Sequence, residues 1–154
     1  MTLRRNDVAS ANLGVALVTD ETIAELNGRF LAHPGPTDVL TFCLADHETD
    51  AADEFDVEGE IVASVETAER ESLHRDHAVE SELALYVVHG TLHLLGYNDG
   101  DRKDAERMHR EEDDILDALG LGRVYRSKSS PRREPPAAVN TLRSFPRVPA
   151  STKR

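Results

Sequence analysis

Residues 80–99 read Glu-Ser-Glu-Leu-Ala-Leu-Tyr-Val-Val-His-Gly-Thr-Leu-His-Leu-Leu-Gly-Tyr-Asn-Asp. The stretch from 80 to 95 is apolar on most sides of a helix, which predicts a buried central helix. His89 and His93 are four residues apart, so their side chains lie one turn apart on the same face of that helix. Gly96 allows the helix to end in a left-handed conformation. The turn that follows brings Asp99 back toward the two imidazoles.

Two imidazoles and one carboxylate on a helix and turn form a three-ligand metal site with an open fourth position, a pattern typical of catalytic zinc. The spacing matches the metalloprotease pattern H-E-x-x-H-x-x-G-x-x-H, with Asp99 at the third ligand. Gly90 replaces the glutamate that acts as general base in those proteases, which argues against peptide hydrolysis. Asp101 is an alternative third ligand.

The flanking sequence predicts an α+β domain in which helices pack on a small mixed β-sheet, with the metal-ligand helix buried at its centre in a zincin-like arrangement. The expected elements are a buried strand at 13–18, a helix at about 20–30, a strand at 38–43, an acidic segment without regular structure at 45–58, a strand at 59–65, a helix at about 66–75, and an amphipathic helix at 101–119. Fewer than fifteen residues precede the first strand, so we expect the sheet to begin near the start of the chain.

Length and composition are those of one domain with a sizeable core. The 154 residues contain no apolar run of about 18 residues that would span a bilayer, and the first residues lack the apolar segment of a signal peptide. The single cysteine, Cys43, excludes an internal disulfide. We therefore expect a cytoplasmic protein without a membrane partner.

Charge is distributed unevenly along a chain whose net charge is −11. Residues 123–154 hold nine Lys and Arg and one acid, Glu134, whereas residues 1–122 hold nine basic and twenty-eight acidic residues. We expect a domain at 1–122 and a basic, disordered tail at 123–154. A basic tail favours a nucleic-acid partner through phosphate contacts. The alternative is a tail that is only solvated.

Several separated motifs together resemble the YbeY family, the metal-dependent endoribonucleases of bacterial ribosomal RNA maturation. The signature is His89 to Tyr97, His-Gly-Thr-Leu-His-Leu-Leu-Gly-Tyr. The other matching segments, in family order, are Leu26-Asn27, Pro36-Thr37-Asp38-Val39-Leu40-Thr41-Phe42 and Gly59-Glu60-Ile61. The similarity covers roughly residues 13–119.

The resemblance implies one zinc ion per chain and cleavage of single-stranded RNA. It further implies a role in forming the 3′ end of 16S rRNA and in ribosome quality control, with the small ribosomal subunit as partner and no DNA substrate. On the family pattern, His89 and His93 are metal ligands. The family's third ligand is usually histidine, and Asp99 stands at that position here. An aspartate brings a negative charge that weakens the Lewis acidity of the metal.

A second difference from the family concerns the cation that would stabilise charge on phosphorus. Leu31 stands where the family usually has an arginine, so Arg29, two residues earlier, is our candidate for that catalytic role. Thr37, Asp38 and Glu60 are candidates for groups that orient the ligands, although Asp38 is also suited to capping a turn.

The sequence therefore predicts a zinc-dependent endoribonuclease whose metal polarises a phosphodiester oxygen or activates a water molecule. Two alternatives remain. One is a zincin-like metallopeptidase with Asp as third ligand. The other is a non-catalytic ribosome-assembly binding protein in which the metal is structural.

Overall fold

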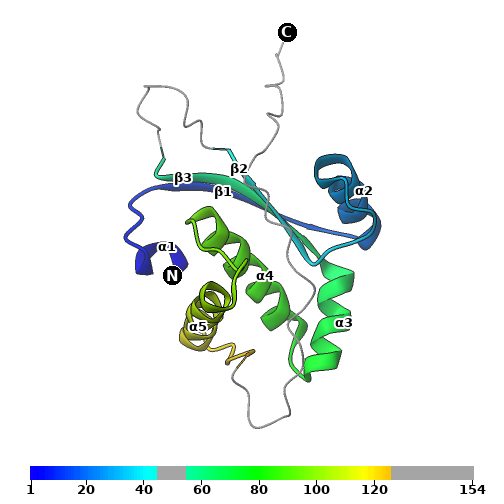
Figure 1. Ribbon diagram of the computed structural model, residues 1–154. Coiled ribbons are helices and arrows are strands. Elements are labelled where there is room, and N and C mark those ends of the chain that lie inside the picture. The colour runs from blue at the N-terminus through cyan, green and yellow to red at the C-terminus, as the bar shows by residue number, and fades with distance from the viewer. Residues whose placement is uncertain (45–54, 126–154) are drawn as a thin grey trace.

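The computed structural model describes residues 1–44 and 55–125, which form a three-stranded sheet with helices on both sides (Figure 1). The elements are α1 (Thr2–Arg5), β1 (Ala11–Val18), α2 (Asp20–Leu31), β2 (Val39–Cys43), β3 (Val57–Ser64), α3 (Val65–Arg75), α4 (Val79–Leu94) and α5 (Arg102–Ala118). The α+β class and the small mixed sheet confirm the predicted fold. The short helix α1 was not predicted.

The sheet has the order β1-β3-β2, so β3 is the central strand. It pairs in parallel with β1, where Val15 lies opposite Ile61, and antiparallel with β2, where Thr41 lies opposite Ile61. Because side chains alternate along a strand, Ile61 and Ala63 of β3 face one layer of helices and Val62 faces the other.

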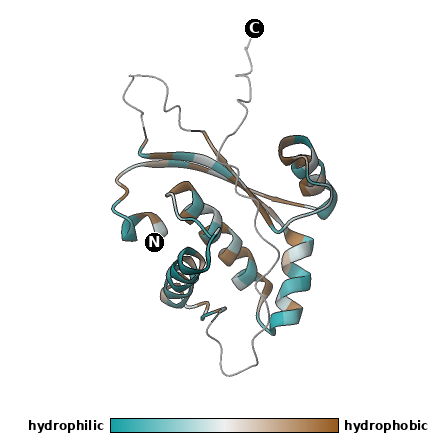
Figure 2. Cartoon of the chain, viewed as in Figure 1, coloured by the Kyte–Doolittle hydropathy of each residue, from teal (hydrophilic) through white to brown (hydrophobic). Residues whose placement is uncertain are grey.

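Each face of the sheet has its own core. Val39, Ile61 and Ala63 point into the larger cluster, which they share with α4 and α5. Leu40 and Val62 point to the other side and pack against Ile23 of α2. Figure 2 shows the same division, with brown apolar residues along α4 and the strands and teal polar residues on α3 and α5.

Side-chain caps explain where three of the helices begin. Thr19 accepts a hydrogen bond from the backbone N–H of Thr22 at the start of α2. Ser64 accepts one from Thr67 at the start of α3, and Asp101 caps α5. These starts confirm the predicted helices to within about two residues.

The prediction that residues 13–18 form a buried strand is correct for the strand and wrong for its burial. β1 lies at an edge of the sheet, and its Val15 and Leu17 side chains are 50% and 54% exposed. The reason is the position of α4, which packs on β2 and β3 and leaves the same face of β1 largely uncovered.

Two predicted boundaries also differ from the structure. Val57 and Glu58, placed in the acidic segment 45–58, belong to β3, while residues 45–54 lie outside the described part of the chain. Val124 and Tyr125, assigned to the tail, donate backbone hydrogen bonds of 2.9 Å to Asp113 Oδ1 and so pack on the domain. Residues 126–154 lie outside the described residues. No helix within residues 1–44 and 55–125 combines the length and apolar character that a membrane span requires.

Candidate metal centre

α4 supplies both histidines, and its packing against the sheet holds them in place. At Gly90 the helix lies directly against the sheet: a Cβ there would lie 2.9 Å from Thr41 Oγ1 and 3.0 Å from Ile61 Cγ2. A glutamate at position 90 would therefore collide with the sheet. The absence of a protease-type general base thus has a steric reason as well as a chemical consequence.

The end of α4 directs the chain back toward the histidines. Gly96 has a φ of +86°, and its N–H donates to the carbonyl of His93 at 2.9 Å. The N–H of Tyr97 donates to the carbonyl of Leu92 at 3.0 Å, which completes a Schellman motif. This confirms the predicted left-handed turn and places Asp99 beside the helix it has just left.

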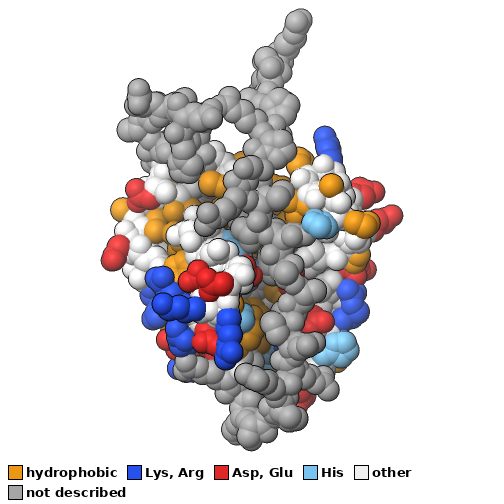
Figure 3. All heavy atoms as spheres, viewed as in Figure 1, with side chains coloured by type: hydrophobic (Ala, Val, Ile, Leu, Met, Phe, Trp, Pro, Cys, Tyr) orange, Lys and Arg blue, Asp and Glu red, His pale blue; other side chains and the backbone are white. Residues whose placement is uncertain are grey.

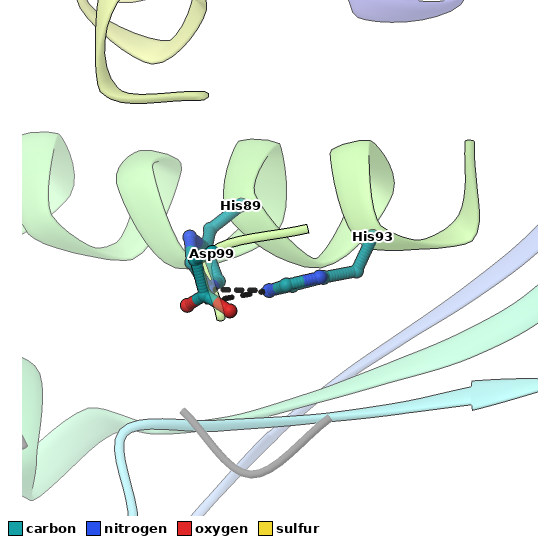
Figure 4. A group of neighbouring side chains, drawn as sticks. All are labelled: His89, His93 and Asp99. Atoms are coloured by element: carbon teal, nitrogen blue, oxygen red, sulfur yellow. Dashed lines mark hydrogen bonds and ion pairs between the residues drawn. The ribbon is translucent and has the colours of Figure 1, made fainter. Parts of the chain in front are cut away.

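The structure brings His89, His93 and Asp99 together, with one ligand atom from each lying within 4.8 Å of the others (Figure 4). The Nε2 atoms of the two imidazoles are 2.9 Å apart, and His93 Nε2 is 3.9 Å from Asp99 Oδ2. Both histidines are buried, whereas the side chain of Asp99 retains 20% exposure. The cluster is therefore buried at the histidines and reached by solvent at Asp99.

The other ring nitrogen of each histidine has a partner of its own. Nδ1 of His89 lies 2.6 Å from Oε1 of the fully buried Glu112, which α5 supplies. Nδ1 of His93 lies 3.1 Å from the carbonyl oxygen of Tyr97. Carboxylate and backbone carbonyl groups are the usual outer partners of metal-binding histidines, because they fix the tautomer and the ring orientation.

These partners determine which nitrogen carries the proton. A carbonyl oxygen can only accept, so the Nδ1–H of His93 donates to Tyr97. An ionised Glu112 accepts from the Nδ1–H of His89 in the same way. Neutral imidazoles in these tautomers direct two Nε2 lone pairs at each other across 2.9 Å. Such an arrangement requires a proton or a metal cation between them, and this requirement is why the residues fit a metal.

The electrostatics of the two rings differ. Burial lowers the pKa of His89, but the hydrogen bond and charge of Glu112 outweigh burial and raise it above its ordinary value. Burial and the neighbouring His89 lower the pKa of His93, against the attraction of Asp99. Of the two rings, His93 is therefore the one that gives up a proton more readily.

The donor set matches zinc in kind, and the two imidazoles match it in spacing. Around a tetrahedral zinc with Zn–N bonds of about 2.0 Å, two ligand nitrogens are ~3.3 Å apart, so the imidazoles would separate by less than about half an ångström. Two imidazoles with a carboxylate leave one position for water or substrate.

Of the two aspartates considered for the third ligand, Asp99 lies in the cluster. Asp101 instead accepts a hydrogen bond of 2.9 Å from the backbone N–H of Asp104 and caps α5. Asp38 accepts hydrogen bonds from Thr37 Oγ1 at 3.0 Å and from the backbone N–H of Val39 at 2.9 Å, so its Oδ1 is engaged by its two sequence neighbours. Its charge also contributes to the raised pKa of His89.

Two predicted site residues lie elsewhere. Glu60 is exposed on the face of the sheet opposite to α4, because the neighbouring Ile61 faces the helix, so the structure does not bring Glu60 to the cluster. Arg29 is exposed on α2, across the sheet from α4, with its guanidinium 5.4 Å from the ring centroid of Phe30. Side chains two positions apart on a helix point about 200° away from each other. Arg29 therefore does not point in the direction of Leu31, which packs toward the smaller core.

Glu112 is the residue that the sequence analysis missed. It occupies the apolar stripe of α5, in register with the buried Met108, Ile115 and Leu116. A carboxylate at such a position needs a buried partner, and this is the signal that would have identified it. Burial raises the pKa of the Tyr125 phenol, and the charge of Glu112 adds to this effect.

Comparison with known proteins gives a consistent result over most of the chain. A family model described as endoribonuclease YbeY matches residues 2–120. The endoribonuclease YbeY of Desulfitobacterium hafniense is 40% identical over 115 residues, covering 72% of this chain and 73% of that protein. That of Heliobacterium modesticaldum is 41% identical over 120 residues, covering 73% and 72%.

A solved structure has the same fold. The solution structure of TM1509 from Thermotoga maritima aligns with a TM-score of 0.53 and 25% sequence identity, covering 86% of this chain and 85% of that one.

Proposed function

Because this chain belongs to the endoribonuclease YbeY family, we propose that it is a metal-dependent endoribonuclease that cleaves single-stranded RNA at the His89, His93 and Asp99 cluster. The observation that carries the proposal is the convergence of two oriented imidazoles and a carboxylate. Within the described residues this cluster alone groups three side chains able to hold a metal ion.

A zinc ion held there supplies Lewis acidity toward a phosphodiester oxygen and a water molecule of lowered pKa. The chain's own residues supply orientation. Glu112 and the Tyr97 carbonyl hold the rings so that both Nε2 atoms face one point. Asp99, whose side chain is 20% exposed, completes the donor set on the side that solvent reaches. Its negative charge makes this centre a weaker Lewis acid than three histidines would.

For the cellular role we infer maturation of the 16S rRNA 3′ end and ribosome quality control in the cytoplasm, with single-stranded rRNA and the small ribosomal subunit as partners. The support is the family membership and the single cysteine, Cys43, which suits a reducing compartment. We expect neither a membrane nor a DNA partner.

The proposal is tested by digesting a labelled single-stranded RNA with purified protein, with and without chelator. Cleavage should require metal and should fall by at least about a hundredfold in His93→Ala. His74→Ala is the matched control, since His74 is an exposed histidine on α3. A casein digest runs in parallel. Chelator-sensitive proteolysis without RNA cleavage would show a peptidase, and intact rRNA processing in cells carrying a folded His93→Ala would show a non-catalytic role.

The third ligand has its own test. Asp99→Ala should lose about a hundredfold or more in zinc affinity, whereas Asp99→His should retain or tighten zinc, because imidazole is the stronger donor. The control is Asp101→Asn, which removes the charge and keeps a residue able to cap α5. Metal content and competition with a chromophoric chelator measure all three. Loss of zinc in Asp101→Asn, with Asp99→Ala unaffected, would transfer the role to Asp101.

A further inference from the structure

Most of the exposed Lys and Arg side chains within residues 1–44 and 55–125 are gathered in one area. Figure 3 shows blue Lys and Arg side chains massed over α1 and α5, beside pale blue histidine. Among the described residues, the exposed Lys and Arg outside these two helices are Arg29 and Arg70. The others form a surface that we name the basic patch: Arg4, Arg5, Arg102, Lys103, Arg107 and Arg110.

The basic patch has helical order. Lys103, Arg107 and Arg110 are spaced i, i+4 and i+7, so they form one stripe along α5. Helix α1 lies beside that stripe, because Arg5 Nε contacts Glu111 Oε1 at 2.7 Å. Arg4 therefore extends the stripe from a second element.

The middle of the stripe lies beside the turn that follows the metal-ligand helix. The guanidinium of Arg107 lies 5.0 Å from the ring centroid of Tyr97, the residue whose carbonyl accepts from His93. The Tyr97 hydroxyl donates to Asn6 Oδ1 at 2.9 Å, which ties the end of α1 to the same turn. A polymer lying on the stripe is thereby guided past the turn that carries Asp99.

Most of this charge is not neutralised within the described residues. Arg5 pairs with Glu111 and Arg102 with Glu106, but Arg4, Lys103, Arg107 and Arg110 form no salt bridge there. The surrounding residues 1–122 carry many more acids than bases. A polyanion is repelled over most of the domain and attracted at this stripe, which orients its approach.

We propose that the basic patch binds the sugar–phosphate backbone of the RNA next to the phosphodiester that is cut. The proposal rests on the proposed function, since it assigns a binding surface to that same substrate. Contacts of Lys and Arg with phosphate are independent of base sequence and weaken with salt through counterion release. The patch therefore contributes affinity and position, and base recognition belongs to other groups.

The test is binding of fluorescent single-stranded oligouridylate and oligoadenylate to metal-free full-length protein, followed by anisotropy over a range of salt. The variant is Lys103→Gln with Arg110→Gln, which spares Arg107 and its contact with Tyr97. We expect affinity about tenfold lower for both oligonucleotides and a salt slope smaller by about 1.4, or about 0.7 for each phosphate that the variant no longer neutralises. Circular dichroism should show an unchanged thermal midpoint.

The control is Arg70→Gln, which removes one positive charge at a surface ion pair outside both the basic patch and residues 123–154. It should bind like wild type. Equal decreases in affinity in the two variants, an unchanged salt slope in the patch variant, or no RNA binding by wild type would each overturn the proposal. If RNA binding depends on the basic patch but the protein cuts no RNA with any metal, the patch proposal stands and the proposed function is refuted.

Discussion

At the residue scale, the site depends on the groups that bind the Nδ1 atoms of the two histidines. His89 is oriented by Glu112 from α5, and His93 by the Tyr97 carbonyl from its own turn. The first interaction joins two helices and is fully buried, whereas the second is local. The orientation of His89 is therefore sensitive to a single carboxylate 23 residues away along the chain.

Glu112→Gln should lower zinc affinity by about ten- to a hundredfold, because the amide keeps the shape and loses the charge that strengthens the ring as a donor. Glu111→Gln is the control, since Glu111 pairs with Arg5 at the surface. Chelator competition measures both affinities and thermal unfolding checks the fold. Equal affinities in Glu112→Gln and wild type would show that the carboxylate does not act through His89.

The sequence was sufficient for the local part of this site. Residue spacing predicted the shared face of His89 and His93, and Gly96 predicted the turn that returns Asp99. It was insufficient for Glu112 and for the position of Arg29, since both depend on how α4, α5 and α2 pack around the sheet. The spacing of residues along one helix can be read from a sequence, whereas the way in which helices pack against one another cannot.

At the element scale, Asp20 joins the starts of two helices. It lies in the first turn of α2 and accepts hydrogen bonds from Ser64, the cap of α3, and from Thr67 and Arg70. Desolvation alone would raise the pKa of Asp20, but the hydrogen bonds outweigh it and lower that pKa to about 2. The ionised carboxylate is thus part of the folded state.

This lowered pKa gives a signed pH dependence. The ionised Asp20 stabilises the folded state fully at pH values above its ordinary pKa of 3.8. This stabilisation is lost as the pH falls toward about 2, because Asp20 takes up a proton at a higher pH in the unfolded state than in the folded state. Asp20→Asn should lower the free energy of unfolding by about 1 kcal/mol at pH 6, and by less at pH 3.5. Urea denaturation measures it, with the neighbouring Glu21→Gln as control. A pH-independent difference would contradict the assignment to Asp20.

The strands show where hydropathy is ambiguous. The apolar residues at 13–18 are compatible with a central strand and with an edge strand, because composition does not show which face of the strand a helix covers. In the structure β3 takes the centre, and β1 is left with Val15 and Leu17 exposed.

At the scale of the whole molecule, charge separates the domain from the residues that follow it. Residues 123–154 contain nine Lys and Arg, in contrast to the acidic domain. The start of this segment is attached to the domain, because the backbone N–H groups of Val124 and Tyr125 donate hydrogen bonds to Asp113. A deletion that begins at 126 therefore keeps these hydrogen bonds, whereas one that begins at 123 removes them.

Deleting residues 126–154 should weaken RNA binding and flatten its salt dependence if these cations contact phosphate. Anisotropy of the same oligonucleotides measures the change, and an unchanged thermal midpoint confirms that the domain is intact. An unaltered salt slope would leave RNA binding to the domain alone.

The three residues of the candidate metal centre lie on different kinds of structure, which would affect how fast a bound ion exchanges. His89 and His93 are carried by buried turns of α4, but Asp99 follows the turn at Gly96, between the exposed residues Asn98 and Gly100. Local opening of such a short exposed stretch requires far less free energy than unfolding a buried helix. A metal ion held by these three residues would therefore enter and leave through opening of the loop, while the core of the domain stays folded.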